Sequence, residues 1–284
     1  MWYSLRTCRP GRTGRHGKEG KYLNPRQPGA AAGSSISVFF PAFNDAATIA
    51  EMVTTALAVL PTITDDYEVL VVDDGSTDAT ASVVADVVRR SPQVRVIRHA
   101  RNRGYGAALS SGFQHASKDL VFYTDGDAQY DVREIARLIP RMTYDVDVVN
   151  GYKRKRADPR HRVVLGAIYN GLARRLFALP IRDVDCDFRL LRRDVIQRID
   201  LVSTSGVVCT EMIYKLSQAG CRFAEVEVQH YPRRHGDSQF FTLPRVARMA
   251  ADFFVLWIRL RVWPRPARAA ARLVAAAGAW PSGQ

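Results

Sequence analysis

The sequence lacks the patterns by which several common protein classes are recognised. It has no Walker A loop and no Gly-x-Ser-x-Gly segment, which excludes the usual P-loop nucleotidases and α/β-hydrolases. Its four cysteines show no Cys-x-x-Cys spacing and its six histidines no His-x-x-x-His spacing, so we expect no zinc site. Cysteines without such a spacing are compatible with a reducing cytoplasm, and no function needs to be assigned to them.

Long apolar segments are also missing. No run reaches the roughly 18 apolar residues of a membrane span, and the N-terminal segment has no apolar core of the secretory kind. We therefore expect a cytoplasmic protein that, if it meets a membrane, lies on the inner face of that membrane.

Positive charge is in excess, and it is unevenly placed. The net charge is +13, of which residues 1–33 contribute +6 and residues 233–284 contribute +7. Between these ends, residues 34–150 are net −6 and residues 151–232 are net +6. This division predicts an acidic, metal-binding first half and a basic, phosphate-binding second half. For the two ends, solvated surface charge is the alternative.

A strongly basic protein can also be a nucleic-acid-binding protein. No DNA- or RNA-binding motif is present, and the paired carboxylates described below would repel phosphates unless they held a metal. We therefore expect no nucleic-acid partner.

Apolar strands alternate with amphipathic helices over residues 36–229. The predicted strands cover 36–40, 67–72, 94–98, 119–124, 146–150 and 222–229, and the predicted helices cover 46–60, 78–90, 104–116, 132–142, 163–178 and 207–219. This order predicts an α/β fold with a Rossmann-like, doubly wound, mostly parallel sheet. We expect a basic loop at 151–163, a second loop around 183–189, and a disordered tail at 1–33.

The segment 241–262 is expected to form an amphipathic helix. At about 100° per residue, its large apolar residues fall on one arc and its arginines gather on the opposite side. The arc holds Val246, Met249, Ala250, Phe253, Trp257 and Leu260, and the opposite side holds Arg245, Arg248 and Arg259. Two interpretations stay open: the arc lies in a membrane interface, or it packs on the domain's own core.

Two acidic clusters follow apolar strands at their carboxyl ends, where open parallel sheets bind ligands. The first is Asp73-Asp74-Gly-Ser, and the second is Asp125-Gly-Asp127-Ala-Gln129. Asp-x-Asp brings carboxylate oxygens near one point, where a hard cation such as Mg²⁺ or Mn²⁺ can be held together with a diphosphate. The first cluster could take the ribose or the base, although helix capping would explain one of its residues.

A glycine-containing segment, Asn102-Arg-Gly104-Tyr-Gly106, resembles a dinucleotide-binding fingerprint only superficially. It does not follow the first strand, and Leu109 stands where that fingerprint needs Gly or Ala, which argues against nicotinamide binding. Either the start of this helix lies against a phosphate or ribose near Gly104, or the glycines serve close packing.

The segment from Lys153 to Arg162 is rich in lysine and arginine. Arginine binds phosphate as a bidentate fork and lysine as a point charge. Beside a nucleotide site this predicts phosphate binding, and a solvated charged loop is the alternative.

Taken together, these motifs resemble those of family 2 glycosyltransferases of the GT-A fold, over about residues 36–240. The resemblance is carried by Phe-Pro41-Ala42-Phe-Asn44-Asp45, Val-Asp73-Asp74-Gly-Ser-Thr-Asp78, Asn102-x-Gly104-x-Gly106-x-Ala108, Thr124-Asp125-Gly-Asp127-Ala-Gln129 and Arg182-Asp183-x-x-Cys186-Asp187-Phe188-Arg189. Within the family, the chain is most similar to polyprenyl-phosphate sugar transferases of the dolichol-phosphate mannose synthase type. It departs from the pattern at Cys186-Asp187, where Ser-Gly is usual, and at Lys153, where Arg is usual.

The resemblance implies a role for each matching position. The nucleotide sugar would be held by Pro41, Ala42, Asn44, Asp45, Asp73, Asp74, Gly104 and Gln129. The metal would be bound by Asp125, Asp127 and Gln129, and the acceptor phosphate by Lys153, Arg160, Arg162, Arg189 and Arg234. Arg234 enters because Arg234-His-Gly-Asp-Ser238 is similar to the family's Arg-x-x-Gly-x-Ser stretch. The catalytic group would comprise Asp125, Asp127 and Asp187.

The resemblance further implies an inverting, Mg²⁺- or Mn²⁺-dependent transfer of one sugar from a UDP- or GDP-sugar to a polyprenyl-phosphate carrier. Two alternatives stay open. One is transfer to a carbohydrate hydroxyl, for which Asp185, Asp187 or Glu211 would be the base. The other is a nucleotidyltransferase, which also uses paired Asp residues and a metal.

The same resemblance suggests how the chain is divided. Residues 34–232 would form the GT-A domain, with a nucleotide-sugar half at 34–150 and an acceptor half at 151–232. We expect none of the membrane-spanning helices that often follow this domain in the family. Amphipathic helices within residues 233–284 would then be the anchor on an anionic membrane surface.

Overall fold

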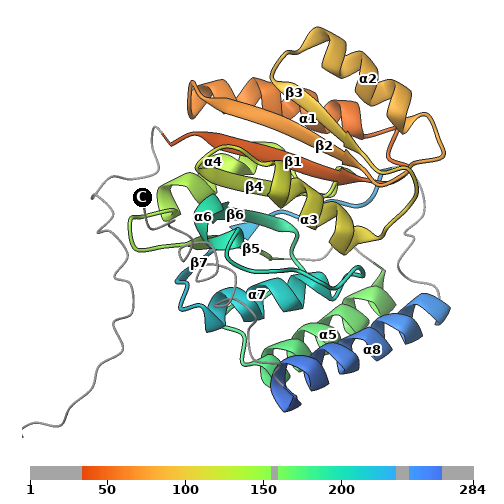
Figure 1. Ribbon diagram of the computed structural model, residues 1–284, viewed down its shortest axis with the longest axis vertical. Helices are drawn as coiled ribbons and strands as arrows, with labels where there is room; N and C mark the ends of the chain where they lie inside the picture. The colour runs from red at the N-terminus through yellow and green to blue at the C-terminus, as the bar shows by residue number, and fades with distance from the viewer. Residues whose placement is uncertain (1–33, 155–158, 235–242, 264–284) are drawn as a thin grey trace, which may run out of the picture.

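The computed structural model describes residues 34–154, 159–234 and 243–263, which build a seven-stranded sheet covered by helices on both faces (Figure 1). The strand order is β3-β2-β1-β4-β6-β5-β7. The strands are β1 (Ile36–Ala42), β2 (Tyr67–Asp73), β3 (Val94–Arg98), β4 (Leu120–Thr124), β5 (Val148–Lys153), β6 (Phe188–Arg192) and β7 (Phe223–Val228). The predicted disordered tail 1–33 and the C-terminal residues 264–284 lie outside the described residues.

The sheet is parallel except at β6, which runs antiparallel to both of its neighbours, β4 and β5. The predicted doubly wound, mostly parallel α/β fold is therefore confirmed. The loop predicted around 183–189 ends earlier than predicted, because Phe188 and Arg189 already belong to strand β6. Arg189 is wholly buried in that strand, and a charged residue is a poor sequence signal for a strand interior.

The main helices are α1 (Ile49–Val59), α2 (Thr80–Arg90), α3 (Tyr105–His115), α5 (Arg160–Phe177), α7 (Val208–Gln218) and α8 (Leu243–Trp257). Shorter ones are η1 (Leu60–Thr62), α6 (Arg193–Ile196) and η4 (Ile258–Val262), which continues α8. The predicted helix 132–142 is instead three short pieces, η2 (Val132–Glu134), α4 (Ile135–Leu138) and η3 (Ile139–Arg141). Pro140 lacks the backbone donor that a continuous helix would need there.

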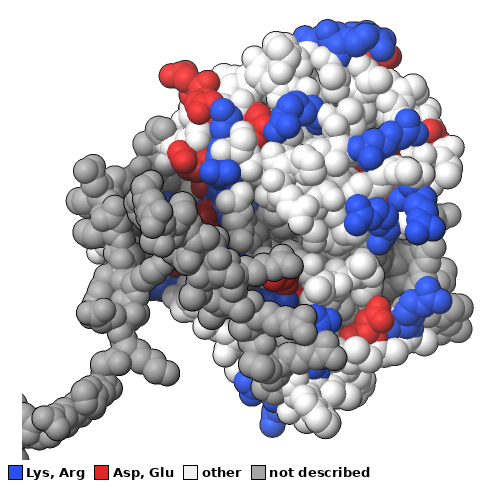
Figure 2. All heavy atoms as spheres, viewed as in Figure 1, with Lys and Arg blue, Asp and Glu red and all other residues white. Residues whose placement is uncertain are grey.

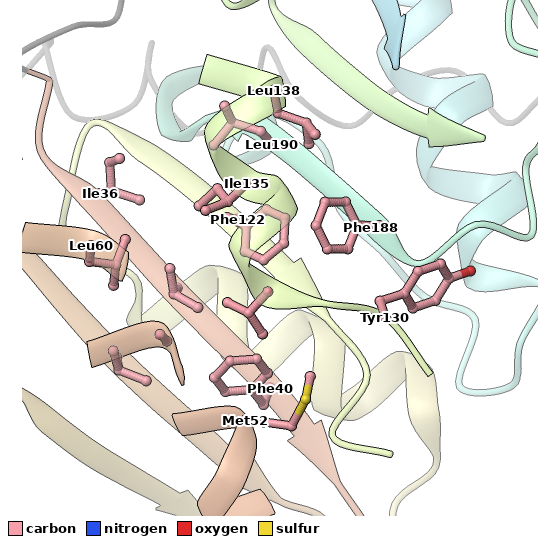
Figure 3. Close-up of a cluster of buried hydrophobic side chains, with 14 of the residues drawn as sticks. Ile36, Phe40, Met52, Leu60, Phe122, Tyr130, Ile135, Leu138, Phe188 and Leu190 are labelled. Atoms are coloured by element: carbon pink, nitrogen blue, oxygen red, sulfur yellow. The ribbon is translucent and has the colours of Figure 1, made fainter. Parts of the chain in front are cut away.

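Two hydrophobic cores lie on the two faces of the sheet. One packs under α1, α2 and α4, and the other under α3, α5, α7 and α8. Successive residues of β1 alternate between them, so Phe40 faces the first core and Phe39 the second. Figure 3 shows the first core, where the rings of Phe122 and Phe188 meet edge to face at 4.7 Å. Each such buried ring contributes about 1.5–3 kcal/mol to stability.

Helix α8 packs beside α5 on the second face (Figure 1). Its Phe253 is 4% exposed, and the ring lies 5.4 Å from those of Tyr169 and Phe177 of α5. Met249, Trp257 and Leu260 of the predicted arc pack partly buried against the same core. The arc therefore faces the domain, and for these residues the docked-helix interpretation is confirmed. No helix in the described ranges is long and apolar enough to cross a bilayer.

Candidate active site

The carboxyl ends of β1, β2 and β4 open into a cavity of about 390 Å³, here called the first cavity. Because β1 lies between β2 and β4, the two acidic clusters, far apart in the chain, meet at this edge of the sheet. Asp74 lines the cavity from the first cluster, and Asp125 and Asp127 line it from the second. Pro41 and Ala42 line it from the end of β1.

A second cavity, of about 320 Å³, continues from the first between α5 and α8. Its polar lining includes Lys153, Arg162 and Asp187, and much of the remaining wall is apolar. The two cavities have in common Tyr105, Asp125, Asp127, Gly206, Arg233 and Met249. Asp125 and Asp127 therefore stand where a ligand in one cavity would meet a ligand in the other.

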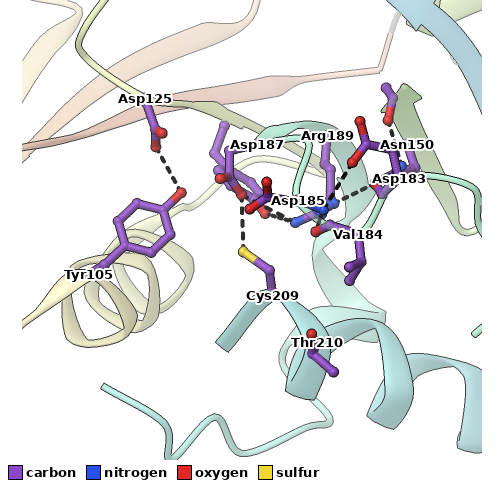
Figure 4. Close-up of polar contacts among 12 residues, drawn as sticks. Tyr105, Asp125, Asn150, Asp183, Val184, Asp185, Asp187, Arg189, Cys209 and Thr210 are labelled. Carbon is purple, nitrogen blue, oxygen red and sulfur yellow. Dashed lines mark hydrogen bonds and ion pairs between the residues drawn. The ribbon is translucent and has the colours of Figure 1, made fainter. Parts of the chain in front are cut away.

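Three carboxylates crowd this junction, those of Asp125, Asp127 and Asp187. Burial raises the pKa of Asp125 well above its usual range, and the neighbouring Asp187 and Asp127 raise it further. Burial also raises the pKa of Asp187, partly offset by Arg189, whose guanidinium lies 3.5 Å away. The Tyr105 hydroxyl donates a 2.8 Å hydrogen bond to Asp125, shown in Figure 4.

This donor set suits a divalent cation. Asp125 and Asp127 present hard oxygen ligands, and their mutual repulsion is the condition that a cation would relieve. Among the described residues, no three acidic, histidine or cysteine side chains are arranged as a ready-made metal site. Mg²⁺ is commonly held by one or two carboxylates plus substrate phosphates, so the residues present fit such an ion.

Asp127 is already engaged by the chain segment that follows β7. Arg233 contacts its Oδ2 at 2.5 Å, while the Gln129 backbone N–H donates to its Oδ1 at 3.0 Å. The same segment pairs with the Gln129 loop, because the Tyr231 N–H donates to the Gln129 carbonyl and the Gln129 amide donates to the Tyr231 carbonyl. Gln129 lines the second cavity, not the first.

Asp45 is a further acidic residue of the first cavity. Burial raises its pKa to about 6, although a hydrogen bond from the Phe43 N–H lowers it and nearby Asp127 raises it again. A carboxyl group with this pKa changes charge easily near neutrality, so a cation or a donor group placed beside it would alter its protonation.

The predicted nucleotide-binding residues divide into those that line the first cavity and those that support it. Asp73 is fully buried outside the cavity lining, where its Oδ1 accepts from the Ser76 N–H. The Asn44 side chain accepts from the Thr77 N–H at 2.8 Å and likewise does not line the cavity. Both residues hold the turn after β2, and neither lines the first cavity, so their contact with a nucleotide stays a prediction.

Asp74 both lines the cavity and shapes the glycine segment. Its Oδ1 accepts from the Arg103 N–H and its Oδ2 from the Gly104 N–H, and His99 contacts it at 2.5 Å. Gly104 lines the cavity with φ of 93°, and a Cβ there would lie 2.5 Å from the Thr204 carbonyl oxygen. Of the two interpretations for the glycines, close packing is what the structure shows at Gly104, together with a place on the cavity wall.

The predicted acceptor-phosphate residues also separate. Lys153 and Arg162 line the second cavity. The Lys153 ammonium lies 3.8 Å from Asp183 and 3.9 Å from Asp185, so it is anchored at the cavity wall. The predicted basic loop is shorter than expected, because α5 begins at Arg160, whose side chain is outside the described residues.

Arg189 is not available to a phosphate, which corrects the prediction for that residue. Its guanidinium is wholly buried and donates to the Asn150 side chain, the Tyr123 hydroxyl and the Val184 carbonyl, as Figure 4 shows in part. It also pairs with Asp187. All its donors face protein groups, so Arg189 orients Asp187 and joins β6 to β4 and β5.

Arg234 is a second correction. Its side chain is exposed and lies 3.2 Å from Glu51 on α1, outside both cavities, whereas Arg233 reaches both. The family's Arg-x-x-Gly-x-Ser spacing, counted back from Gly236, falls on Arg233. A stricter count would therefore have found the residue that contacts Asp127.

Other lining residues have no sequence motif that could reveal them. Tyr105 follows Gly104, and its hydroxyl reaches Asp125 only because α3 starts beside β4. Arg248 and Asp252 of α8 line the first cavity, and so does the loop 204–206. They come from elements distant in sequence, so only the tertiary contacts place them here.

Comparison with known proteins shows which protein family this chain matches. The model of the glycosyl transferase family 2 matches residues 37–200. Glycosyltransferase AglD of Haloferax volcanii is 30% identical over 254 residues, covering 86% of this chain and 40% of that protein. An undecaprenyl-phosphate 4-deoxy-4-formamido-L-arabinose transferase of Edwardsiella ictaluri is 30% identical over 207 residues, covering 72% and 62%. The chain thus spans less than two thirds of the length of these relatives.

A solved structure shares the fold. Glucosyl-3-phosphoglycerate synthase from Mycobacterium tuberculosis, crystallised with Mn²⁺, UDP and phosphoglyceric acid, superposes with a TM-score of 0.63 at 20% identity. The match covers 80% of this chain and 78% of that one. This structural similarity supports the GT-A fold. The strand order and the cavity at the carboxyl ends of the strands already indicate that fold.

Proposed function

The chain belongs to glycosyl transferase family 2, and from this premise we propose that it transfers one sugar from a UDP- or GDP-sugar to a polyprenyl-phosphate carrier. The relatives named for undecaprenyl phosphate support the choice of acceptor. The solved neighbour with Mn²⁺ and UDP supports a metal-bound nucleotide sugar as donor. Residues 34–150 would supply most of the donor site and residues 151–232 much of the acceptor site.

The observation that carries the proposal is the meeting of two unlike cavities at Asp125 and Asp127. The first cavity lies at the strand ends where α/β sheets bind nucleotides. The second combines Lys153 and Arg162 with apolar walls, which suits a phosphate attached to a hydrocarbon. Donor and acceptor could therefore meet at the carboxylates, which is the geometry that group transfer requires.

Each residue at the junction has a proposed task. Asp125 and Asp127 would hold Mg²⁺ or Mn²⁺, which supplies charge neutralisation to a departing diphosphate when bound. Arg233, now paired with Asp127 at 2.5 Å, is close enough to contact the same diphosphate. Tyr105 fixes the orientation of Asp125 through its 2.8 Å hydrogen bond. Asp45 and Asp74 would line the nucleotide's path.

The acceptor needs little activation if it is a phosphate. A phosphate monoester has its second pKa near 6, so it is largely dianionic at neutral pH and can attack without a dedicated base. Lys153 and Arg162 would orient it for displacement with inversion. A carbohydrate hydroxyl is the second candidate, because Asp187 lines the acceptor side and its raised pKa would suit a base.

The surface around the second cavity is suited to a membrane. Large apolar residues on α5 and on α8 with its continuation are exposed, namely Val164, Leu165, Ile168, Leu172, Phe254, Val255, Ile258, Val262 and Trp263. We call this set the apolar face. Such a patch on a basic protein, with Arg259 and Arg261 in the same continuation, fits an anionic bilayer. On the side shown in Figure 2, lysine and arginine form separate blue groups, several of them next to red acidic residues.

We propose that the protein is peripheral on the cytoplasmic side of the membrane, bound through the apolar face. The free cysteines Cys186, Cys209 and Cys221 fit a reducing compartment. Val255→Glu combined with Ile258→Glu should release the protein from phosphatidylglycerol vesicles in a sedimentation assay. Val96→Glu, at a 44% exposed position on β3 far from α8, is the matched control. Sedimentation that is unchanged in the double variant would refute this attachment.

The activity is tested with purified protein, Mg²⁺, undecaprenyl phosphate and a panel of UDP- and GDP-sugars. The expected result is nucleoside diphosphate release together with one lipid-extractable sugar, from one donor. Release only with a carbohydrate acceptor would establish the hydroxyl alternative instead. Release of free pyrophosphate would identify a nucleotidyltransferase.

A further inference from the structure

Two charged residues of α8 line the first cavity and have no task in the site described above. Arg248 and Asp252 are four residues apart, so they lie on the same side of the helix. Neither side chain has a hydrogen-bond or ion-pair partner within the described part of the chain. Arg248 is exposed and Asp252 is half-buried. Both are therefore available to a ligand in the first cavity.

Asp252 is an unexpected residue at its position in α8. Every other residue from Met249 to Ile258 is apolar, and aspartate is a weak helix former. It lies well inside the helix, so it gains nothing from the macrodipole, whose effect is confined to the end turns. The next residue, Phe253, is 4% exposed and packs on the second core, so the helix holds Asp252 in place. A charged residue that breaks the local pattern without stabilising its helix indicates a function in binding.

The loop 204–206 also lines the first cavity, and its backbone is held firmly. The Thr204 carbonyl accepts a 2.9 Å hydrogen bond from the Gly106 N–H at the start of α3. The buried carboxylate of Glu211 accepts a 2.8 Å hydrogen bond from the Ser203 N–H, just before the loop. Helix α8 and this loop therefore form a fixed polar wall, and a fixed wall can discriminate between ligands.

The order of groups in a nucleotide sugar decides which part of it meets this wall. This placement rests on the proposed function, in which the metal and the diphosphate lie at Asp125 and Asp127. The sugar is joined to the diphosphate, and it must face the second cavity, from which the acceptor attacks. Gly206 and Met249 line both cavities, so the loop and α8 both reach the junction. The donor's sugar would therefore lie against them.

We propose that Asp252 and Arg248 select the donor by its sugar, and that this sugar is uncharged and recognised through its hydroxyl groups. A carboxylate accepts hydrogen bonds from hydroxyl groups and a guanidinium donates to their oxygens, so the two side chains together match a polyhydroxy ring. An acidic sugar is disfavoured, because carboxyl groups outnumber guanidinium groups in the cavity lining by five to two. The carboxyl groups are those of Asp45, Asp74, Asp125, Asp127 and Asp252, and the guanidinium groups are those of Arg233 and Arg248. A divalent metal would offset only part of this excess.

The test compares the binding of nucleoside diphosphates with that of their sugar derivatives, by titration calorimetry on the full chain with Mg²⁺ and without an acceptor. The ligands are UDP, GDP and three pairs that differ only at C6 of the sugar: UDP-glucose and UDP-glucuronate, UDP-galactose and UDP-galacturonate, GDP-mannose and GDP-mannuronate. The variants are Asp252→Ala and Arg248→Ala. Their controls are Asp65→Ala and Arg175→Ala, at exposed positions that line neither cavity.

The tightest-binding sugar derivative should be the uncharged member of its pair, about tenfold tighter than the matching acid. Asp252→Ala and Arg248→Ala should each weaken its binding about tenfold, because hydrogen bonds to a charged group are lost. Binding of the free nucleoside diphosphate should stay unchanged in both variants, which also shows that they fold, and the controls should match the wild type. Tighter binding of the acid, variants that bind the sugar derivative like the wild type, or an equal loss for the nucleoside diphosphate and its sugar derivative would overturn the proposal.

This proposal and the proposed function can fail separately, because the binding test contains no acceptor. Selective binding of an uncharged sugar derivative that depends on Asp252, without transfer to undecaprenyl phosphate, would retain the sugar site and reject the proposed acceptor. Transfer to undecaprenyl phosphate with unchanged donor selectivity in both variants would retain the function and reject the sugar site.

Discussion

Replacement of Arg189 should destabilise the fold and should not act by removing a contact to the acceptor phosphate. Arg189 lies in β6 with a fully buried guanidinium, paired with Asp187 at 3.5 Å and bonded to Asn150, Tyr123 and Val184. Arg189→Met keeps much of the side-chain volume but removes every one of these donors. It leaves buried oxygens without partners and Asp187 without its nearest positive charge.

The structure sets the size of the effect. Breaking a buried ion pair by removing one partner costs about 3–5 kcal/mol, because the other charge stays buried and uncompensated. That is a large share of the about 5–15 kcal/mol by which domains are stable. In a domain of this size it should lower Tm by about 10 °C, at about 2–4 °C per kcal/mol. Without Arg189, the pKa of Asp187 should rise further, since Arg189 is the group that lowers it most.

The assay is urea unfolding followed by circular dichroism, for wild type, Arg189→Met and Arg182→Met. Arg182 forms an exposed pair with Glu225 at 3.4 Å and is 66% exposed, so its replacement should cost about 1 kcal/mol or less. An Arg189→Met protein of wild-type stability that had lost only acceptor affinity would refute this reasoning and restore the phosphate-binding role.

Three further predictions concern charge. Asp127→Asn should lower kcat about 100-fold or more, by loss of one electrostatic contact at the reacting centre, and wild-type turnover, or full activity in EDTA, would contradict the metal role. Asp187→Asn should retain near-full kcat if the acceptor is a phosphate, whereas a collapse of kcat with intact binding would favour a hydroxyl acceptor. Although burial would raise it, hydrogen bonds from Ser37, Arg95 and Ser117 lower the pKa of Glu68 to about 2. The stability this provides, about 3 kcal/mol, is therefore present above about pH 4.5 and lost as pH falls toward 2. Glu68→Gln should lose it in urea unfolding at pH 7 but not at pH 2, and an equal loss at both pH values would count against this account.

The sequence alone was enough for six of the seven strands, all but β6, and for the position of the acidic clusters. Strands such as β1 and β2 are short apolar runs between polar turns, so their pattern identifies them without tertiary information. In a doubly wound sheet, parallel strands end at one edge, so carboxylates that follow two such strands must meet there. This rule predicted that Asp74, Asp125 and Asp127 would lie at one cavity.

The locations of three arginine side chains were not predicted correctly from the sequence. Arg189, Arg233 and Arg234 all stand in family-like motifs, yet one is buried, one reaches the junction and one lies on the surface. A long cationic side chain takes the partners that the fold brings within its reach, and those partners lie on other elements. Motif spacing counted from Gly236 distinguishes Arg233 from Arg234, but nothing in the sequence around Arg189 indicates that its side chain is buried.

The helix at 243–257 makes the same point for apolar residues. Periodicity predicted the arc around Phe253 correctly, because a helical repeat depends only on neighbours along the chain. It did not predict that this arc would be covered by α5, nor that Phe254 and Val255 would stay exposed beside a groove. Which face of a helix is buried depends on what packs against it, and for α8 that partner is provided only by the tertiary structure.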